Sequence, residues 1–293
     1  MAAESVPPRD ARLRLRDGRW LGYAEYGDPA GRPVLCFHGS PGARYERHPD
    51  ESIARSLCAR VIVPDRPSYG LSDFLPGRRL LDWPEDVAQL ADALRLGSFA
   101  LVGYSGGGPY AAACAFKMPE RLTRVALVAS PAPPAQRGML AGMEPLNRLT
   151  FALGRLPWPA QRPLYALGAS YVRRDPLRAV RRIVPLLPPE DRAVLARPEV
   201  KQVFVEAAAE AFRQGGRGAA WDDRLCARPW GFALDALTTA TSLWQGERDS
   251  MVTPAMGRYL ARTIPNCRAN FLPDAGHLVF YTHWERILSD VLA

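Results

Sequence analysis

The stretch Gly103-Tyr104-Ser105-Gly106-Gly107 has the pattern G-x-S-x-G and stands between a short apolar run and a helical pattern. Residues 100–103 read as a strand covered on both faces, and residues 106–117 predict a helix. Ser105 is therefore expected on a sharp strand-to-helix turn, where small neighbours relieve crowding and helical N–H groups favour developing negative charge. The competing structural interpretation is a glycine-rich packing turn.

These glycines do not fit a nucleotide-binding loop. The G-x-G-x-x-G fingerprint needs glycine at position 105, which is serine, and it normally lies at the first strand-to-helix turn of a sheet. Neither lysine of the chain, Lys117 or Lys201, lies in a G-x-x-x-x-G-K-[ST] sequence. We therefore predict no phosphate-binding loop and no cofactor.

Short apolar segments alternate with longer helical patterns along most of the chain, which indicates an α/β fold with a mainly parallel sheet. Two alternating segments on either side of Asp17-Gly18 predict an antiparallel hairpin at its edge. The predicted strands cover residues 12–16, 20–26, 34–37, 60–63, 100–103, 125–128, 241–244 and 268–272. Further helices are expected over residues 83–96, over residues 255–263 and after Tyr281.

The middle third of the sequence has a different pattern. Between residues 131 and 235, prolines separate short helical segments over residues 165–172, 177–184 and 200–212, without a strand pattern. We therefore expect residues 131–235 to be a helical insertion into a sheet domain formed by residues 1–130 and 236–293.

The composition excludes other classes of protein. A hydrophobic content of 47% argues against disorder, and the net charge of +8 comes from scattered arginines without a basic run typical of nucleic-acid binding. The five cysteines form neither a C-x-x-C pair nor a disulfide framework, so no metal site is predicted. Without a long apolar run or an apolar leader, we expect a cytoplasmic protein with no membrane span.

A serine hydroxyl needs a base to take its proton, and four histidines are available. His277 ends the turn Asp274-Ala275-Gly276-His277 after the last predicted strand, at the rim where parallel strands end together. His283 is expected on the final helix and His48 is expected to face solvent. His277 is therefore the predicted base.

The base in turn needs a carboxylate that fixes its tautomer. Asp249 follows the preceding strand and lies 28 residues before His277. Glu247 and Asp274 are alternatives, although both are more typical of solvated loop charges. The order Ser105, Asp249, His277 is the Ser…Asp…His order of α/β-hydrolases.

An oxyanion hole is predicted from the loop His38-Gly39-Ser40-Pro41-Gly42, which follows the strand over residues 34–37. The backbone N–H groups of Ser40 and Gly106 are the expected donors. His38 is expected to hold this loop through side-chain hydrogen bonds rather than to act as a second base.

With these motifs, the sequence resembles the α/β-hydrolase superfamily over nearly its whole length outside the middle insertion. The stretch Asp65-Arg66-Pro67-Ser68-Tyr69-Gly70-Leu71-Ser72 adds to the likeness, but relatives commonly have glycine where this chain has Ser68. The resemblance implies an eight-stranded α/β-hydrolase fold whose helical cap, residues 131–235, covers the active site.

The resemblance also implies a metal-free serine hydrolase acting on a small, apolar, ester-like molecule. Lactonases, thioesterases, C–C bond hydrolases and perhydrolases use the same residues, whereas relatives with a carboxylate at position 105 act as epoxide hydrolases or dehalogenases. The peptidase alternative is weakened because the oxyanion loop contains Ser40. The rival from another class is a receptor-like ligand-binding protein with little turnover.

Overall fold

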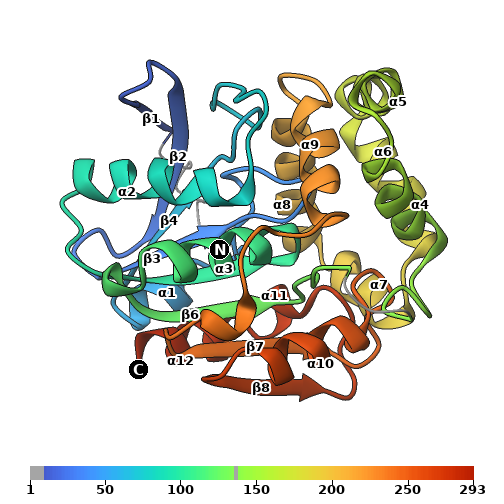
Figure 1. Cartoon of the computed structure of the whole chain (residues 1–293). Coiled ribbons are helices and arrows are strands. Elements are labelled where there is room, and N and C mark those ends of the chain that lie inside the picture. The colour runs from blue at the N-terminus through green and yellow to red at the C-terminus, as the bar shows by residue number, and fades with distance from the viewer. Residues whose placement is uncertain (1–9, 135–137) are drawn as a thin grey trace.

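The computed structural model describes residues 10–134 and 138–293. At its centre lies an eight-stranded sheet with the order β1-β2-β4-β3-β5-β6-β7-β8 (Figure 1). Strand β2 is antiparallel to β1 and β4, and all other neighbours are parallel, which confirms the predicted mainly parallel sheet. The strands are β1 (Ala11–Arg14), β2 (Trp20–Gly27), β3 (Arg32–Phe37), β4 (Ala59–Pro64), β5 (Phe99–Tyr104), β6 (Leu122–Val128), β7 (Thr241–Gly246) and β8 (Cys267–Leu272).

Both faces of the sheet are buried, because successive residues of its central strands enter two different apolar cores. In β3, Leu35 and Phe37 belong to one core, whereas Val34 and Cys36 belong to the other. This two-sided burial explains why the central strands are continuously apolar in sequence. The first core is covered by α2 (Trp83–Ala93), α3 (Gly108–Lys117) and α10 (Pro254–Thr263), and the second by α1 (Ser52–Ser56), α11 (Val279–Thr282) and α12 (Trp284–Leu292).

Element ends differ from the sequence predictions where the backbone turns early. Strand β1 stops at Arg14 because Leu15 already forms the hairpin turn, with hydrogen bonds to Gly18 and Arg19. Helix α2 ends at Ala93, shortly before Arg95 adopts a positive φ of 56°. Three short 3₁₀ helices complete this part of the fold: η1 (Leu80–Asp82), η2 (Ser105–Gly107) and η3 (Pro119–Arg121).

Between β6 and β7 the described residues contain helices and no strand. We call α4–α9 the insert helices; five of them, α4 to α8, have proline in the first turn, where its missing N–H costs no hydrogen bond. Helices α5, α6 and α8 correspond to the three helical patterns predicted here. The elements are α4 (Pro145–Gly154), α5 (Trp158–Arg174), α6 (Pro176–Ile183), η4 (Val184–Leu186), α7 (Pro189–Ala196), α8 (Pro198–Ala211), α9 (Arg217–Cys226) and η5 (Leu234–Ala236).

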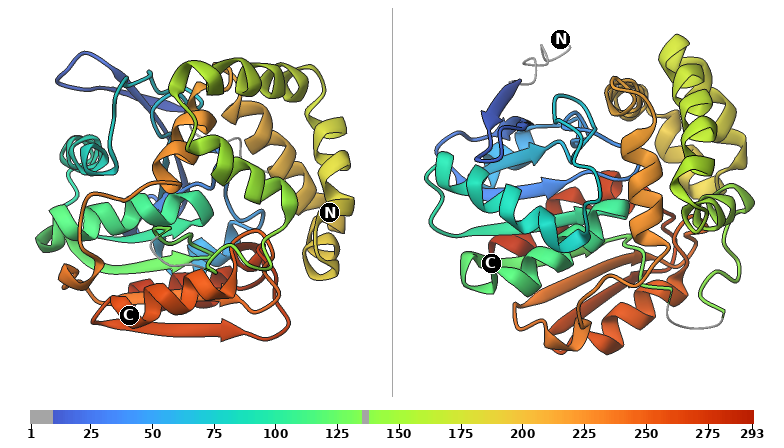
Figure 2. Two further views of the ribbon diagram at one scale, coloured as in Figure 1. Left: turned by 45° about the vertical axis from the view of Figure 1, so that its right-hand side comes forward. Right: turned by 45° about the horizontal axis from the view of Figure 1, so that its top comes forward.

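The insert helices form two layers beside the sheet. Helices α8 and α9 lie nearer the strands, and α4, α5 and α6 pack on them from outside (Figure 2). None of the helices in residues 10–134 and 138–293 is both long and apolar enough to cross a bilayer.

The loop after β4 retains a tight path without the glycine that relatives commonly have. Ser68 itself adopts a positive φ of 73°, and Gly70 follows with a φ of 47°. The Ser68 N–H donates to the carbonyls of Ser72 and Asp73, which hold the serine in this strained conformation.

Candidate active site

Ser105 lies at the tight turn between β5 and α3, as the flanking patterns predict. Its φ is +49°, a left-handed conformation that is strained for serine. The turn also passes very close to its neighbours. A Cβ added at Gly107 would lie 2.2 Å from the Phe37 carbonyl oxygen, and one at Gly103 would lie 2.7 Å from the Ala111 Cβ. Only glycine fits at these two places, and the half-buried Ser105 side chain is left at the rim of the sheet.

The structure brings the three predicted polar side chains together in one hydrogen-bonded chain. His277 Nε2 lies 3.0 Å from Ser105 Oγ, and His277 Nδ1 lies 2.9 Å from Asp249 Oδ2. Asp249 follows β7, and His277 follows β8, so both reach the site from the ends of parallel strands. With Nδ1–H donating to Asp249, Nε2 is free to accept the serine proton.

The Asp249 carboxylate is held rigidly and is shielded from water. Its Oδ1 accepts the N–H groups of Met251 and Val252, both at 2.8 Å, and its Oδ2 also accepts from Gln245 Nε2 at 3.1 Å. These bonds leave one oxygen directed at His277.

The two alternative acids form ion pairs of their own. Glu247 pairs with Arg258 at 2.6 Å, and the exposed Asp274 pairs with Arg248 at 3.2 Å. Of the three carboxylates considered from sequence, Asp249 is the one that the structure places against the His277 ring.

The surroundings of His277 favour its protonated form. Burial lowers the pKa of His277, but the charge and hydrogen bond of Asp249 outweigh burial and raise the pKa above its usual 6.5. The charges of Asp191 and Glu46 act in the same direction. The imidazolium that would form on proton transfer is therefore stabilised.

The two residues whose amides are expected to form an oxyanion hole, Ser40 and Gly106, are in close contact. A Cβ added at Gly106 would lie 3.1 Å from the Ser40 nitrogen, so the Ser40 amide sits against the residue that follows Ser105. Within the described part of the chain, the Ser40 N–H has no hydrogen-bond acceptor. An unoccupied amide beside the serine can bind a developing oxyanion.

His38 holds the oxyanion loop, as its place in the sequence suggests. Its Nδ1 lies 2.8 Å from the Gly39 carbonyl, and its Nε2 accepts the Arg66 N–H at 3.1 Å. Burial and the charge of Arg66 lower the pKa of His38 well below its usual 6.5, so it stays neutral. It therefore ties the loops after β3 and β4 together.

A buried carboxylate of α9 organises the oxyanion loop from the insert side. Asp222 accepts hydrogen bonds from Arg66 at 2.8 and 3.0 Å and from Arg78 at 2.7 Å. It also lies 3.2 Å from Ser40 Oγ. Burial favours the neutral acid, but the two arginines hold the pKa of Asp222 well below its usual range. The hydroxyls of Tyr69 and Tyr110 complete this network.

A second buried carboxylate of the insert holds the loop that carries His277. Asp191 of α7 accepts the His277 N–H at 2.9 Å and the Leu278 N–H at 2.8 Å. A Cβ at Gly276 would lie 2.4 Å from its Oδ1, so glycine is required where the loop meets this carboxylate. The insert helices thus hold both the loop of His277 and the loop of Ser40.

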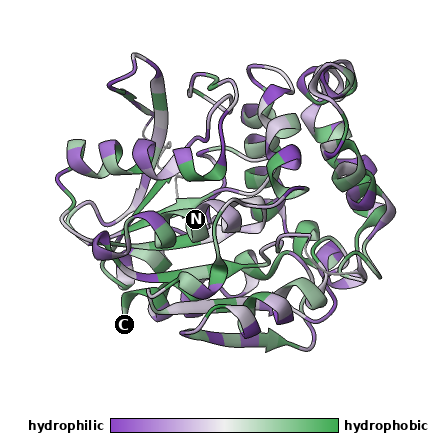
Figure 3. Cartoon of the chain, in the orientation of Figure 1, coloured by the Kyte–Doolittle hydropathy of each residue, from purple (hydrophilic) through white to green (hydrophobic). Residues whose placement is uncertain are grey.

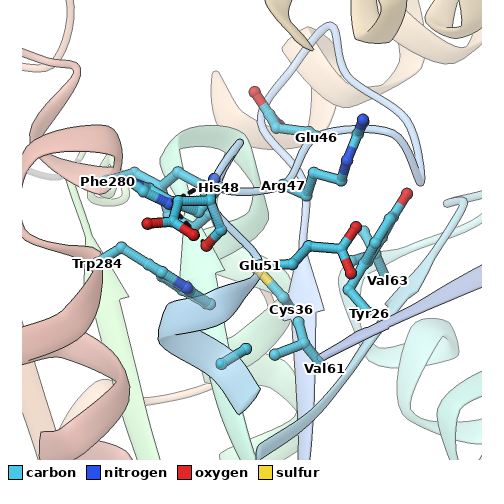
Figure 4. A pocket seen from close by; sticks show the side chains of 12 residues that line it. Tyr26, Cys36, Glu46, Arg47, His48, Glu51, Val61, Val63, Phe280 and Trp284 are labelled. Atoms are coloured by element: carbon cyan, nitrogen blue, oxygen red, sulfur yellow. Dashed lines mark hydrogen bonds between the residues drawn. The ribbon is translucent and has the colours of Figure 1, made fainter. Parts of the chain in front are cut away.

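Glu46, His48 and Phe280 are among the residues that line a small cavity (Figure 4). Its volume of about 10 Å³ is enough for roughly one water molecule and too small for a substrate. His48 is half-buried here, with its Nε2 3.3 Å from the Tyr281 carbonyl, so the prediction that it faces solvent is wrong. His283 is the residue directly before α12.

Glu46 is a buried carboxylate that accepts the Gly39 N–H of the oxyanion loop. Burial raises the pKa of Glu46 to about 7, and the hydrogen bond from Gly39 and the charges of Arg66 and His277 oppose that rise. Sequence reasoning identified none of the roles of Glu46, Asp191 and Asp222. The two aspartates act across contacts between distant segments, and Glu46, seven residues after Gly39, belongs to no short motif.

Several aromatic side chains between β6 and β7 pack on other aromatic side chains. Trp158 and Trp221 meet edge to face at 4.7 Å between ring centroids and both contact Phe74. Phe232 stacks on Phe116 at 5.3 Å and contacts Trp230.

Across residues 10–134 and 138–293, no cluster of three or more His, Cys, Asp or Glu side chains is arranged to hold a metal ion.

Comparison with known proteins gives matches over the full fold. Residues 32–283 match the family model for the alpha/beta hydrolase fold. A 2-hydroxymuconate semialdehyde hydrolase of Pseudomonas putida is 27% identical over 98% of this chain and 94% of its own length. The solved structure of a thermophilic esterase from Thermogutta terrifontis has a TM-score of 0.66 and 26% identity, with 97% of each chain covered.

Other curated relatives match locally, and this chain spans less than half of their length. A non-heme chloroperoxidase of Streptomyces lividans, for example, is 33% identical over 40% of this chain and 43% of that protein. The family model nevertheless spans most of the sequence, and the strand arrangement agrees with it. The chain therefore belongs to the α/β-hydrolase family.

Proposed function

We propose that the protein is a serine hydrolase that cleaves small carboxylic esters or lactones through an acyl-enzyme. The observation that carries this proposal is the continuous hydrogen-bonded chain from Ser105 through His277 to Asp249, with the Ser40 amide beside Gly106. We also propose that residues 131–235 are the cap and that residues 1–130 and 236–293 are the catalytic core.

In the proposed reaction, Ser105 Oγ forms a bond to the ester carbonyl carbon while His277 Nε2 takes the hydroxyl proton. The carbonyl oxygen becomes an oxyanion that accepts the N–H groups of Ser40 and Gly106. His277 then gives its proton to the departing alcohol, and the acyl group remains on Ser105. Water, deprotonated by His277, releases the acid and restores the serine.

The buried arginines near the oxyanion loop favour an uncharged substrate. A substrate carboxylate would need an unpaired cation, but Arg66 and Arg78 already share Asp222. The full-length similarity to 2-hydroxymuconate semialdehyde hydrolase makes C–C bond hydrolysis the second candidate on the same three residues.

The proposal is tested by measuring turnover of p-nitrophenyl esters of increasing acyl length, of lactones and of β-diketones, and by intact-mass analysis after fluorophosphonate treatment. We expect ester or lactone turnover and one covalent adduct on Ser105. Turnover of β-diketones alone would favour the C–C hydrolase. Specific binding without turnover of any class would favour a receptor-like protein.

The pH dependence of catalysis follows from the raised pKa of His277. The ring must be neutral to accept the serine proton, so kcat/KM falls as the pH drops through that pKa. Because Asp249 raises the pKa, we expect the midpoint of this acid limb above 6.5. A pH–rate profile on an uncharged ester measures it, and a flat profile between about pH 5 and 8 would contradict the assignment of His277.

Glu46 provides a prediction about stability. Its pKa is raised from 4.5 to about 7 in the folded protein, so the folded state loses stability as the pH rises between these values. Glu46→Gln keeps an acceptor for the Gly39 N–H but carries no charge. We expect it to be more stable than the native protein at about pH 8, by up to about 3 kcal/mol, and not at about pH 5.

Denaturant unfolding at the two pH values measures this difference. Glu199→Gln, which changes an exposed glutamate of α8, is the matched control and is expected to have no pH-dependent effect. An equal stability difference between Glu46→Gln and the native protein at both pH values would show that Glu46 does not titrate in this range.

A further inference from the structure

The net positive charge of the chain is concentrated in one segment of the sequence. Residues 145–186, which form α4, α5, α6 and η4, contain eight arginines and a single acidic residue, Asp175. This segment therefore carries a net charge of +7 out of the +8 of the whole chain. All eight arginines are exposed, and none pairs with a carboxylate within the described ranges: Arg148, Arg155, Arg162, Arg173, Arg174, Arg178, Arg181 and Arg182.

The same segment carries the exposed apolar side chains. Every large hydrophobic residue that is clearly exposed, among those the structure describes, lies between residues 145 and 186. Leu167 is the most exposed, at 74% of its full area. The complete set is Leu146, Leu149, Leu156, Leu164, Leu167, Leu177 and Leu186. Exposed apolar side chains that gather on one group of helices in this way are typical of an interaction surface.

These residues lie on the outer side of the molecule. Helices α4 and α5 pack against α9, and α6 packs against α5 and α8, so their inner sides are buried, as at Phe151, Ala169 and Val180. The opposite sides face solvent at the edge of the molecule that is away from the sheet (Figure 1). Hydrophobic and hydrophilic residues alternate along these helices (Figure 3). We call the exposed side of residues 145–186 the outer insert face.

We propose that the outer insert face docks on an anionic lipid surface. Exposed leucines on helices that lie flat can enter the boundary between headgroups and acyl chains, and arginines around them attract anionic headgroups, each by about 1 kcal/mol. Docking of this kind needs no membrane-spanning helix. It would place the insert helices, which hold the loops of Ser40 and His277, against the lipid.

The charge of the outer insert face favours an anionic lipid surface over a second copy of the chain or a nucleic acid as its partner. A second copy of the chain docked through the same face would bring a charge of +7 against +7, which opposes association. A nucleic acid would leave the seven leucines in contact with water or sugar-phosphate. Lipid headgroups and acyl chains satisfy both the arginines and the leucines.

The proposal is tested by co-sedimentation of the full chain with vesicles of phosphatidylcholine, with or without about 30% phosphatidylglycerol, at about 0.1 M salt. We expect binding to the anionic vesicles and at least tenfold weaker binding to the neutral ones. Two variants separate the contributions: Arg178→Glu/Arg181→Glu removes basic charge, and Leu164→Ser/Leu167→Ser removes apolar contact. Both are expected to weaken binding at least about fivefold, in line with about 1 kcal/mol per group.

The matched control is Arg55→Glu/Arg262→Glu, which makes the same change of charge on α1 and α10, outside the outer insert face. It is expected to bind nearly as the native protein does. If the leucine variant bound the vesicles as well as the native protein, the binding would be unspecific adsorption and the proposal would be wrong. The same would follow if the control variant bound as weakly as the arginine variant. Absence of vesicle binding would overturn the proposal too, whether sedimentation then shows a monomer or a dimer.

The result does not depend on the chemistry of the site. Ser105→Ala is expected to bind the vesicles as the native protein does, because Ser105 lies outside the outer insert face. Vesicle binding without turnover of esters or lactones would therefore support the docking surface and contradict the proposed hydrolase activity. Turnover of esters or lactones without vesicle binding would support the hydrolase activity and contradict the docking surface.

Discussion

Ser105→Ala is expected to lower kcat/KM for p-nitrophenyl esters by about 10,000-fold or more, because the acyl-enzyme cannot form without the nucleophile. Alanine is the appropriate replacement. Ser105 has a φ of +49°, and alanine has the same backbone restriction as serine, so the strain of the turn is retained. The variant should therefore fold like the native protein and should lose the fluorophosphonate adduct.

The control for this experiment is Ser56→Ala, on the exposed side of α1. It is expected to keep full turnover and full labelling. If Ser105→Ala retained the native rate while thermal unfolding remained unchanged, another side chain would be the nucleophile. The proposed mechanism would then be wrong, although the family membership of the chain would stand.

Asp222→Ala is expected to destabilise the protein by about 3–5 kcal/mol, because it leaves Arg66 and Arg78 buried and charged without a counter-ion. Asp222→Asn keeps the shape but also removes the charge, so we expect most of the loss there too. In thermal unfolding, a loss of this size corresponds to a melting temperature lower by roughly 5–8 °C.

The matched control is Asp235→Ala, which removes an exposed carboxylate of η5 and should change stability by less than about 0.5 kcal/mol. If Asp222→Asn proved as stable as the native protein, the charge of Asp222 would be dispensable and the network would be held by hydrogen bonds alone. Denaturant unfolding at equilibrium distinguishes these outcomes.

Local patterns were sufficient to predict the parts of the site that lie at strand ends. The carboxyl ends of parallel strands meet at one rim, so a polar residue just after each strand is placed by the sheet itself. Ser105, Asp249 and His277 follow β5, β7 and β8 in this way, and the structure brings them within hydrogen-bond distance. Their catalytic roles stay predictions until the variants are measured.

The supporting residues could not be predicted in this way. Asp191 and Asp222 come from helices whose packing against the sheet depends on many weak contacts, and neither belongs to a short motif. Arg66 stands in a stretch that resembles the family, but its partner lies 156 residues away in sequence. His48 illustrates the converse error, since its polar neighbours suggested exposure, whereas it is half-buried and lines a cavity together with Phe280 and Trp284.

The two aspartates of the insert also limit how the protein can be re-engineered. Asp191 holds the loop of His277 and Asp222 contacts the loop of Ser40, so the helical unit is part of the framework of the candidate site and not an independent cover. A chimera that received this unit from another hydrolase would need both carboxylates at matching positions. Specificity is therefore better altered by substitution within the native helices than by exchanging them as a block.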